Sequence, residues 1–129
     1  MDNNIIGPSP YMHLLGIKVE EAVYPRARLV LEYNKNLTNP MGTLHGGVIA
    51  SLVDAALGCA LFQDRKVRGI ATVELKVNYL RAITEGTVYI EGEILHRGSS
   101  MAFGQVHIYN NGALTAIGSA TYKLKVKAL

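Results

Sequence analysis

The sequence predicts an α+β domain in which a curved antiparallel sheet wraps around one long, buried helix. The first observation behind this prediction is an apolar segment, residues 45–63, which opens with a Gly-rich turn and is rich in Ala and Gly. A helix that is apolar nearly all round is expected to be covered on several sides. The second observation is a change of period after this segment, because apolar and polar residues then alternate through most of the remaining chain.

Before the long helix, cap and turn signals predict one short helix, two short strands and a loop. The short helix is predicted over residues 8–15. Ser9 can cap it, Pro10 suits its first turn, and Gly16 can end it. Alternation then predicts strands at 17–22 and 26–33 with Tyr24-Pro25 as the turn between them, followed by a polar loop at 34–43.

After the long helix, the alternation predicts four longer strands, joined as consecutive antiparallel hairpins. The predicted ranges are 69–80, 87–95, 101–109 and 114–125, separated by turn signals at 84–86, 97–99 and 110–112. The Asn-Gly pair at 111–112 is a strong hairpin signal. In the first of these strands, strict alternation puts one set of side chains on one face and a second set on the other. The sets are Val73, Leu75, Val77 and Tyr79 against Thr72, Glu74, Lys76 and Asn78.

Length and composition favour a single globular domain over residues 1–129. The apolar fraction is 49%, the charged fraction is 18%, and the formal net charge is +3. The basic residues are dispersed, so no nucleic acid partner is implied, although a phosphate-bearing small ligand is compatible with this charge. The last predicted strand places three lysines on one face, which indicates a solvated face or a blunted sheet edge: Lys123, Lys125 and Lys127.

The cellular context expected from the sequence is a reduced one. Cys59 is the single cysteine and cannot form an internal disulfide. Residues 1–4 lack a basic signal-peptide start, and no long apolar run follows them. The apolar helix is shorter than the usual membrane span of about 20 residues and carries an acid at its centre. A cytoplasmic protein without a membrane segment is therefore expected.

The long helix carries two features that suggest chemistry. Asp54 is the only formally charged side chain between residues 48 and 62, and a buried carboxylate is costly unless something pairs with it or uses it. His45-Gly46-Gly47 stands where the helix begins, and the free N–H groups of a first turn favour negative charge. Gly46 and Asp54 would lie about 12 Å apart along one helix, given the rise per residue. If both act on one substrate, two antiparallel helices are needed, most simply in a twofold dimer.

Taken together, these motifs resemble the hotdog-fold thioesterases, specifically the phenylacetate-degradation (PaaI-like) branch. The likeness runs from about residue 34 to residue 125. Its strongest part is His-Gly-Gly followed nine residues after the histidine by an acid, inside an apolar helix and before four strands. The residues that carry the likeness are Asn39, the run 42–47, Asp54, and the runs 72–74, 79–82 and 96–103.

This resemblance implies a hotdog fold, a homodimer whose sheets join edge to edge, and often a homotetramer formed as a dimer of dimers. It also implies hydrolysis of acyl-coenzyme A thioesters in a tunnel at the dimer interface, with no metal or redox cofactor. Asp54 would act as general base or nucleophile. The Gly46 N–H would polarise the thioester oxygen as an oxyanion hole does. Each role has a structural alternative. Asp54 would then be a buried acid that caps a loop of the partner chain, and Gly46 would be part of an ordinary helix-start turn.

Three further residues are catalytic candidates, each with a structural alternative. His45 would orient the substrate or hold the loop, and a lone histidine beside a helix start is more often structural. Asn39 would offer its amide to the carbonyl or the water, or would serve as a turn residue before Pro40. Thr72 matches the position where the family places a hydroxyl that orients water, and the alternative is an ordinary strand threonine. Some hotdog enzymes carry a hydroxyl one turn after the acid, where this chain has Gly58.

The candidates for substrate binding lie in two other segments. Coenzyme A carries phosphates, and the segment 96–100 offers an Arg, two hydroxyls and the backbone beside a glycine. An ordinary hairpin turn is the alternative reading of that segment. The substrate-binding candidates from both segments are Tyr79, Arg81, His96, Arg97, Gly98, Ser99 and Ser100.

The sequence leaves other functions open. A non-catalytic acyl-CoA-binding module is the main alternative, because one fold can serve several functions. A hotdog dehydratase or hydratase needs a His and an acid placed for proton transfer at carbon, but His45 and Asp54 are nine residues apart on one helix. A purely structural dimer would leave the charge of Asp54 unexplained. The acyl group is not specified by any motif.

Overall fold

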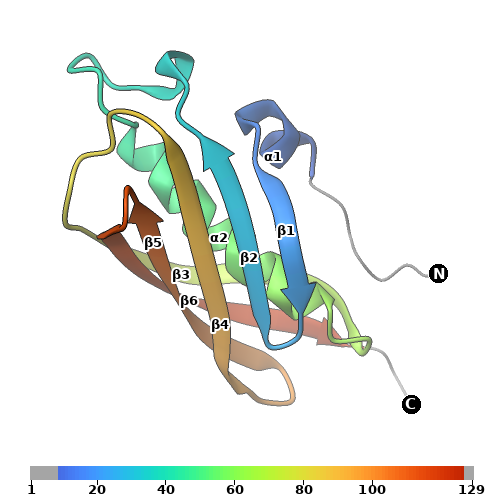
Figure 1. The fold of residues 1–129 in the computed structure, drawn as a ribbon. Helices are drawn as coiled ribbons and strands as arrows, with labels where there is room; N and C mark the ends of the chain where they lie inside the picture. The colour runs from blue at the N-terminus through green and yellow to red at the C-terminus, as the bar shows by residue number, and fades with distance from the viewer. Residues whose placement is uncertain (1–8, 127–129) are drawn as a thin grey trace.

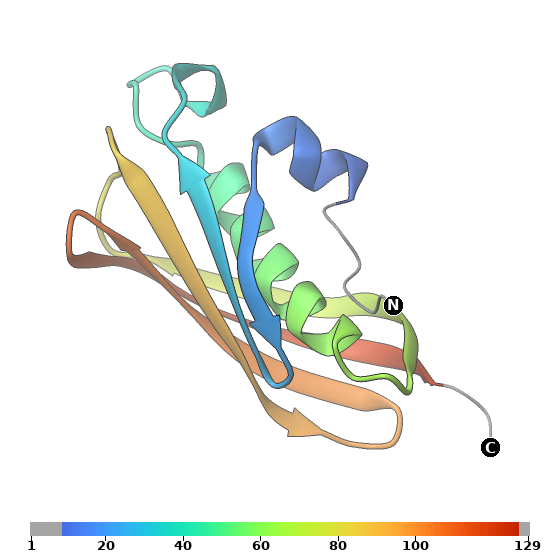
Figure 2. The ribbon, with the colours of Figure 1, turned by 45° about the vertical axis from the view of Figure 1, so that its right-hand side comes forward.

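A computed structural model describes residues 9–126 as a six-stranded antiparallel sheet that curves around one long helix. The strand order is β1-β2-β4-β5-β6-β3, so β1 and β3 are the two edges of an unclosed sheet. Figure 1 shows α2 lying across the sheet, and Figure 2 shows the strands curving around it. The elements are α1 (Pro10–Leu15), β1 (Lys18–Val23), β2 (Arg26–Glu32), η1 (Lys35–Leu37), α2 (Gly46–Phe62), β3 (Val67–Tyr79), β4 (Thr87–Arg97), β5 (Met101–Asn110) and β6 (Ala113–Val126).

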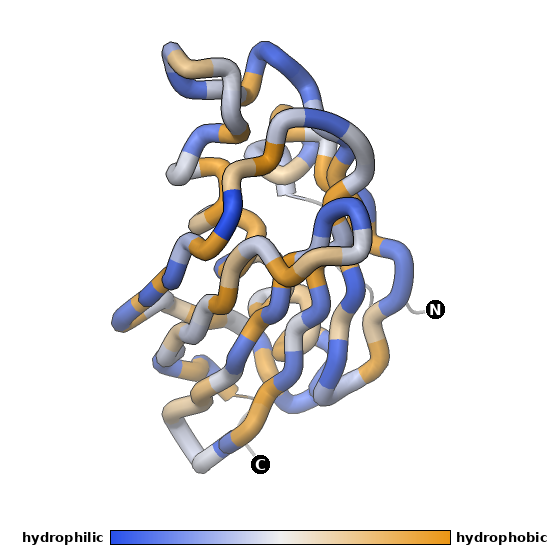
Figure 3. The backbone as a smooth tube through the Cα atoms, turned by 60° about the vertical axis from the view of Figure 1, so that its left-hand side comes forward, coloured by the Kyte–Doolittle hydropathy of each residue, from blue (hydrophilic) through white to orange (hydrophobic). Residues whose placement is uncertain are grey.

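The core lies between α2 and the concave face of the sheet. The helix residues that contact the sheet are fully buried, and they include Leu52, Val53, Ala56, Leu57, Ala60 and Leu61. Burial along β2, β4 and β5 alternates residue by residue, as expected for strands with one face on a core. Figure 3 shows the same alternation as hydrophilic and hydrophobic segments that follow one another along the strands. The predicted α+β architecture with a central helix is confirmed.

One stripe of α2 is left less covered than the rest. Gly47 is exposed, and Ser51, Asp54 and Ala55 are half-buried, whereas most of the other helix residues are buried. These four positions follow the helical spacing of three or four residues, so they share one side of the helix. Asp54 therefore lies on the more open side of α2, although the helix as a whole is a core element.

Local signals placed most element ends correctly. Ser9 caps α1 by accepting a hydrogen bond from the Met12 N–H (3.2 Å), and Gly16 ends the helix with a φ of 85°. The β5–β6 turn has positive φ at both Asn111 (52°) and Gly112 (75°), as a tight two-residue hairpin requires. Pro8, which was included in the predicted first helix, lies outside the described residues.

Several expectations from the sequence are wrong in detail. The strands on either side of the 84–86 turn do not form a hairpin, because β3 pairs with β6 while β4 pairs with β2 and β5. The loop at 34–43 contains the short 3-10 helix η1, which the Asn34 side chain caps by accepting from the Asn36 N–H (2.9 Å). The lysine-bearing strand β6 pairs on both sides, with β5 and with β3, so its lysines do not blunt an edge. Lys123 and Lys125 are exposed, in agreement with the solvated-face interpretation, and Lys127 lies outside the described residues.

A β-bulge in β3 overturns the predicted face of Thr72. In the pairing with β6, Thr72 lies opposite Tyr122 and Glu74 lies opposite Thr121, so Val73 has no partner of its own. Such an extra residue shifts the alternation by one position. Thr72 therefore turns toward α2 instead of sharing the outer face with Glu74. Strict alternation from the sequence had placed these two side chains together.

Within residues 9–126, no helix has both the length and the apolar character needed to cross a bilayer.

Candidate active site

Asp54 is held at one oxygen by two hydroxyl groups from the sheet. Its Oδ1 accepts a hydrogen bond from Thr72 Oγ1 on β3 (2.9 Å) and another from the Tyr122 hydroxyl on β6 (2.8 Å). No group among residues 9–126 donates to Oδ2, and this oxygen is not one of the buried atoms that lack a partner. No Lys, Arg or His of the described residues forms an ion pair with Asp54. The carboxylate thus presents one satisfied and one open oxygen.

Tyr122 is the donor that sequence reasoning missed. Its side chain is fully buried, and its hydroxyl also lies 3.2 Å from the main-chain oxygen of Asp54. Burial raises the pKa of Tyr122 far above its ordinary value, and the nearby Asp54 charge and hydrogen bond raise it further. The hydroxyl therefore keeps its proton and remains a donor. The available signal was weak: a tyrosine at a core strand position needs a hydrogen-bond partner.

The start of α2 leaves one backbone donor free. His45 is the N-cap, and its Nδ1 accepts a hydrogen bond from the Gly47 N–H (2.8 Å). The Val48 N–H donates to the main-chain oxygen of His45 (2.9 Å). Among residues 9–126, the Gly46 N–H has no acceptor. Since the positive end of the helix dipole lies here, this N–H is suited to polarise a carbonyl oxygen.

A cleft of about 530 Å³ opens beside this helix start. The Tyr79 hydroxyl donates to the Gly46 main-chain oxygen (2.8 Å), which joins the end of β3 to the first turn of α2. Arg81 is exposed and lines the same cleft. The structure thus brings together four candidates that lie far apart in the sequence: Asn39, Gly46, Tyr79 and Arg81.

Asn39 lines this cleft, but most of its side chain holds its own loop. Its Oδ1 accepts hydrogen bonds from the N–H groups of Met41 (2.9 Å) and Thr43 (3.2 Å). Its Nδ2 donates to Thr43 Oγ1 (2.6 Å), which leaves the second amide hydrogen without an acceptor among the described residues. The geometry is therefore compatible with both roles considered for Asn39, a turn residue and a donor to the substrate, because one amide hydrogen is still free.

Asp54 does not line the cleft at the helix start. Gly46 and Asp54 belong to the same unbroken helix, and eight residues of helical rise separate them by about 12 Å. A general base must come within about 3 Å of its target or act through one water. One chain therefore carries two separate groups of candidate residues, one around Asp54 and one around Gly46, which are called half-sites below.

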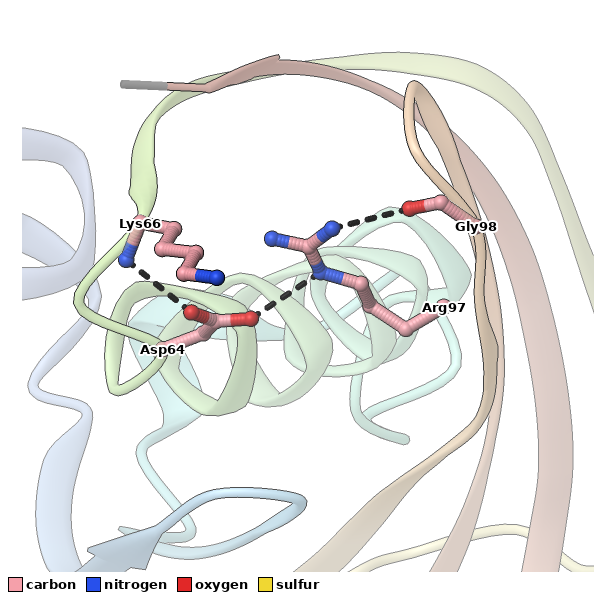
Figure 4. Close-up of polar contacts among 4 residues, drawn as sticks. All are labelled: Asp64, Lys66, Arg97 and Gly98. Atoms are coloured by element: carbon pink, nitrogen blue, oxygen red, sulfur yellow. Dashed lines mark hydrogen bonds and ion pairs between the residues drawn. The ribbon is translucent and has the colours of Figure 1, made fainter. Parts of the chain in front are cut away.

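The segment 96–100 lies elsewhere, near the carboxyl-terminal end of α2. Arg97 is the last residue of β4 rather than part of a free turn, and its Nε donates to Asp64 Oδ2 at 2.9 Å (Figure 4). Its Nη1 donates to the Gly98 main-chain oxygen (2.9 Å), while Asp64 Oδ1 accepts from the Lys66 N–H (3.0 Å). Both charged side chains are only 19% exposed, so this pair fastens the helix end to the β4–β5 hairpin.

The rest of that segment is more open to solvent. His96, Ser99 and Ser100 are exposed, and the Gly98 N–H is used in the turn, where it donates to the Met101 main-chain oxygen (2.7 Å). Within residues 9–126, no group of three His, Cys, Asp or Glu side chains is arranged to hold a metal ion.

Comparison with known proteins decides the family. A family profile described as the Thioesterase superfamily matches residues 41–117, which is more than half of the chain. The chain belongs to the thioesterase superfamily. It is therefore a thioesterase-type hydrolase, and the resemblance that the sequence motifs indicated is confirmed. The match includes the His-Gly-Gly start of α2, Asp54 and Thr72.

Individual relatives of this thioesterase-superfamily chain agree with the assignment. Mouse acyl-coenzyme A thioesterase 13 is 34% identical over 90 residues, which cover 67% of this chain and 64% of the mouse protein. The structure of zebrafish thioesterase superfamily member 2 matches with a TM-score of 0.81 and 29% identity, covering 95% and 91% of the two chains. The PaaI protein of the E. coli phenylacetic acid degradation operon matches with a TM-score of 0.84 at 19% identity, covering 91% and 85%. That last likeness is one of fold, and the hotdog fold is confirmed.

His45 gives a prediction that separates capping from chemistry. His45→Ala removes the side-chain acceptor of the Gly47 N–H and is expected to lower the free energy of unfolding by about 1 kcal/mol. His45→Asn, which supplies a good N-cap acceptor, is expected to restore most of that stability and to keep full thioesterase activity. Urea unfolding at one fixed protein concentration and steady-state kinetics measure both effects. An inactive but fully stable Asn variant would instead give His45 a chemical role.

Proposed function

We propose that this chain hydrolyses acyl-coenzyme A thioesters at sites shared between two copies, with Asp54 of one copy facing Gly46 of the other. The observation that carries this proposal is the open Oδ2 of Asp54, on a carboxylate that lacks an ion-pair partner among the described residues. Acyl-coenzyme A is taken as the substrate class because a curated relative is named for it. The separation of the two half-sites on one helix supports sharing between copies.

The proposed chemistry uses each half-site for one task. Asp54 Oδ2 accepts a proton from a water molecule, whose oxygen attacks the thioester carbonyl carbon. The negative charge that develops on the carbonyl oxygen is stabilised by the Gly46 N–H of the other copy. The C–S bond then breaks, and the coenzyme A sulfur leaves as the thiol after taking the proton that Asp54 accepted from the water, which restores the carboxylate. Direct attack by Oδ2, with hydrolysis of the resulting anhydride, is the nucleophilic version of the same proposal.

Thr72 and Asn39 are proposed to support these two groups. The Thr72 hydroxyl donates a hydrogen bond to Asp54. Its oxygen lone pairs therefore remain free to accept a hydrogen bond from the attacking water. Asn39 lines the cleft beside Gly46, and its remaining amide hydrogen is proposed to donate to the substrate. Both roles place neutral donors and acceptors around the reacting carbonyl without adding a second charge.

The edge strand β3 supports the proposed homodimer. It is 13 residues long, has β6 as its one partner strand within residues 9–126, and leaves Val73 and Tyr79 more than half exposed. A long unpaired edge is a template for pairing with another strand. Joining two β3 edges about a twofold axis would continue the sheet and set the open stripes of two antiparallel α2 helices side by side. We extend the proposal to a homotetramer on the family resemblance alone.

The coenzyme A nucleotide is proposed to lie between the exposed donors of segment 96–100 of one copy and Arg81 of the other, since the two lie at opposite ends of α2 within one chain. The exposed groups there are His96, Ser99 and Ser100, whereas Arg97 is largely occupied by Asp64. Arg97 Nη2 has no partner among the described residues but is buried, so Arg97 would contribute its positive charge rather than a direct hydrogen bond. Phosphate groups favour such charged and hydroxyl donors.

Release of free thiol tests the proposed reaction directly. Acyl-coenzyme A substrates with aromatic, hydroxybenzoyl and medium-chain acyl groups would be incubated with the protein, and the thiol followed with a chromogenic thiol reagent. Ranking them by kcat/KM would identify the acyl group. Tight acyl-CoA binding without any thiol release would instead establish the non-catalytic binding module.

Mixing two inactive variants tests whether the sites are shared. Asp54→Asn lacks the proposed base, and Gly46→Pro lacks the proposed N–H donor. In a mixed dimer, one of the two sites combines the intact Asp54 of one copy with the intact Gly46 of the other. Random exchange makes half of the dimers mixed, so activity should recover to about a quarter of the wild-type value. Thiol release after co-refolding measures it.

The control for this experiment is each variant refolded alone, which should stay inactive. Sites contained within single chains would remain broken in every mixed dimer, so a mixture no more active than its components would contradict sharing. The oligomeric state of each preparation is checked by light scattering, because a monomer cannot form mixed sites.

A further inference from the structure

We propose that Tyr122 is a positioning residue for the thioesterase reaction, because its buried hydroxyl holds Asp54 at Oδ1 and leaves Oδ2 as the reacting oxygen. This inference rests on the proposed function of Asp54 and goes beyond it. It assigns a role to a core residue of β6 that does not itself touch substrate. It also states which of the two carboxylate oxygens faces the substrate.

The geometry around Oδ1 carries the inference. The Tyr122 hydroxyl lies 2.8 Å from Oδ1 and 3.2 Å from the main-chain oxygen of the same residue. Thr72 Oγ1 reaches the same Oδ1 at 2.9 Å. Two donors on one oxygen define the plane of the carboxylate, because rotation of the side chain would break both hydrogen bonds. The second oxygen is then held in one direction without any contact of its own among the described residues.

The sheet positions the two donors, Thr72 and Tyr122, next to each other. Thr72 on β3 and Tyr122 on β6 are directly opposite each other in the antiparallel register. Side chains that are opposite across two strands share one face of the sheet, and here that face looks onto α2. The bulge at Val73 follows immediately and is the feature that turns Thr72 toward the helix. Both donors therefore belong to the rigid sheet rather than to a loop.

The two donors differ in how replaceable they are. Thr72 belongs to an exposed edge strand, so water can take the place of its hydroxyl. Tyr122 is fully buried, so its hydroxyl is not in contact with solvent that could replace it. Loss of the Tyr122 hydroxyl leaves Oδ1 of Asp54 with one hydrogen bond fewer, and the carboxylate is then free to rotate toward solvent. Tyr122 is therefore the donor on which the orientation of Asp54 depends.

The experiment is Tyr122→Phe, which removes one oxygen atom and keeps the ring in the core. Because small displacements of a reacting group are damaging, kcat on a preferred acyl-CoA should fall by about 10- to 100-fold. KM should be unchanged, since no substrate contact is lost. Tyr109→Phe is the matched control: Tyr109 stacks on His107 away from α2, and its variant should keep the wild-type kcat.

A second measurement distinguishes positioning from general damage to the fold. In the Asp54→Asn background, Tyr122→Phe should cause no further loss of the residual rate, because the group it positions is already disabled. An equal fold-loss in both backgrounds, or a wild-type kcat in Tyr122→Phe beside an inactive Asp54→Asn, would overturn the positioning role and leave the proposed function standing. A wild-type rate in Asp54→Asn would remove Asp54 from the proposed reaction, and the positioning role of Tyr122 with it, while acyl-CoA hydrolysis itself would stand.

Discussion

Asp54→Asn is expected to lower kcat on acyl-coenzyme A substrates by several orders of magnitude while the fold and the association of the chain persist. The amide oxygen of Asn can take the place of Oδ1 and still accept from Tyr122 and Thr72. Its nitrogen, however, stands where Oδ2 stood and can neither accept a proton nor attack a carbonyl carbon. The variant therefore removes the chemistry and keeps the structural hydrogen bonds.

Steady-state thiol release measures this loss, and thermal unfolding shows whether the fold is kept. Glu74→Gln is the matched control, because Glu74 is an exposed carboxylate of the same edge strand that carries Thr72. It removes one negative charge from that strand, on the face that points away from α2, and should leave kcat unaltered. Turnover at the wild-type rate in Asp54→Asn would exclude Asp54 from the mechanism.

Gly46→Pro is the second substitution with a large expected effect. Proline has no backbone N–H, so the variant deletes the proposed oxyanion donor, and its ring also adds three carbon atoms at that position. The site tolerates proline because Gly46 is the first residue of α2 and His45 before it is extended (φ −61°, ψ 137°). Loss of one oxyanion-hole donor is expected to reduce kcat by about 10²- to 10³-fold.

Gly46→Ala is the control that separates the missing N–H from the added side-chain carbon. A Cβ at this position would lie 3.4 Å from the Tyr79 hydroxyl, which is an ordinary contact. Alanine keeps the N–H, so its kcat should remain far above that of the proline variant. Equal losses in the two variants would show that crowding of the cleft, and not the missing hydrogen bond, limits the reaction.

The larger features of the fold could be predicted because local chemistry specifies them. The Asn111-Gly112 pair adopts the positive φ angles that such hairpin turns require, and Ser9 caps α1 as its side chain suggests. The apolar segment became a central helix because the apolar surface around it must be buried. The likeness of the segment around Asp54 to a thioesterase motif was also readable, since it depends on residue types at fixed spacing.

The hydrogen-bond partners within the candidate site could not be predicted from local patterns in the same way. Arg97 looked like a free phosphate ligand in a turn, but its partner Asp64 is 33 residues away in the chain. No sequence pattern singled out Tyr122, and its partner Asp54 is 68 residues away. Hydrogen bonds across such separations depend on strand order and register, which no local pattern encodes.

By itself, the sequence determined the central helix, the antiparallel strands, the free N–H at Gly46 and the isolated acid at Asp54. Each of these depends on interactions between residues that are close in the chain. Only the tertiary structure decided that Thr72 faces the helix, because a single extra residue, Val73, shifts the alternation of an edge strand. The tertiary structure likewise decided that Oδ1 of Asp54 accepts two hydrogen bonds while Oδ2 accepts none from the described residues. Whether a bulge forms, and which oxygen is bonded, depends on the fit between β3, β6 and α2 once they have packed together.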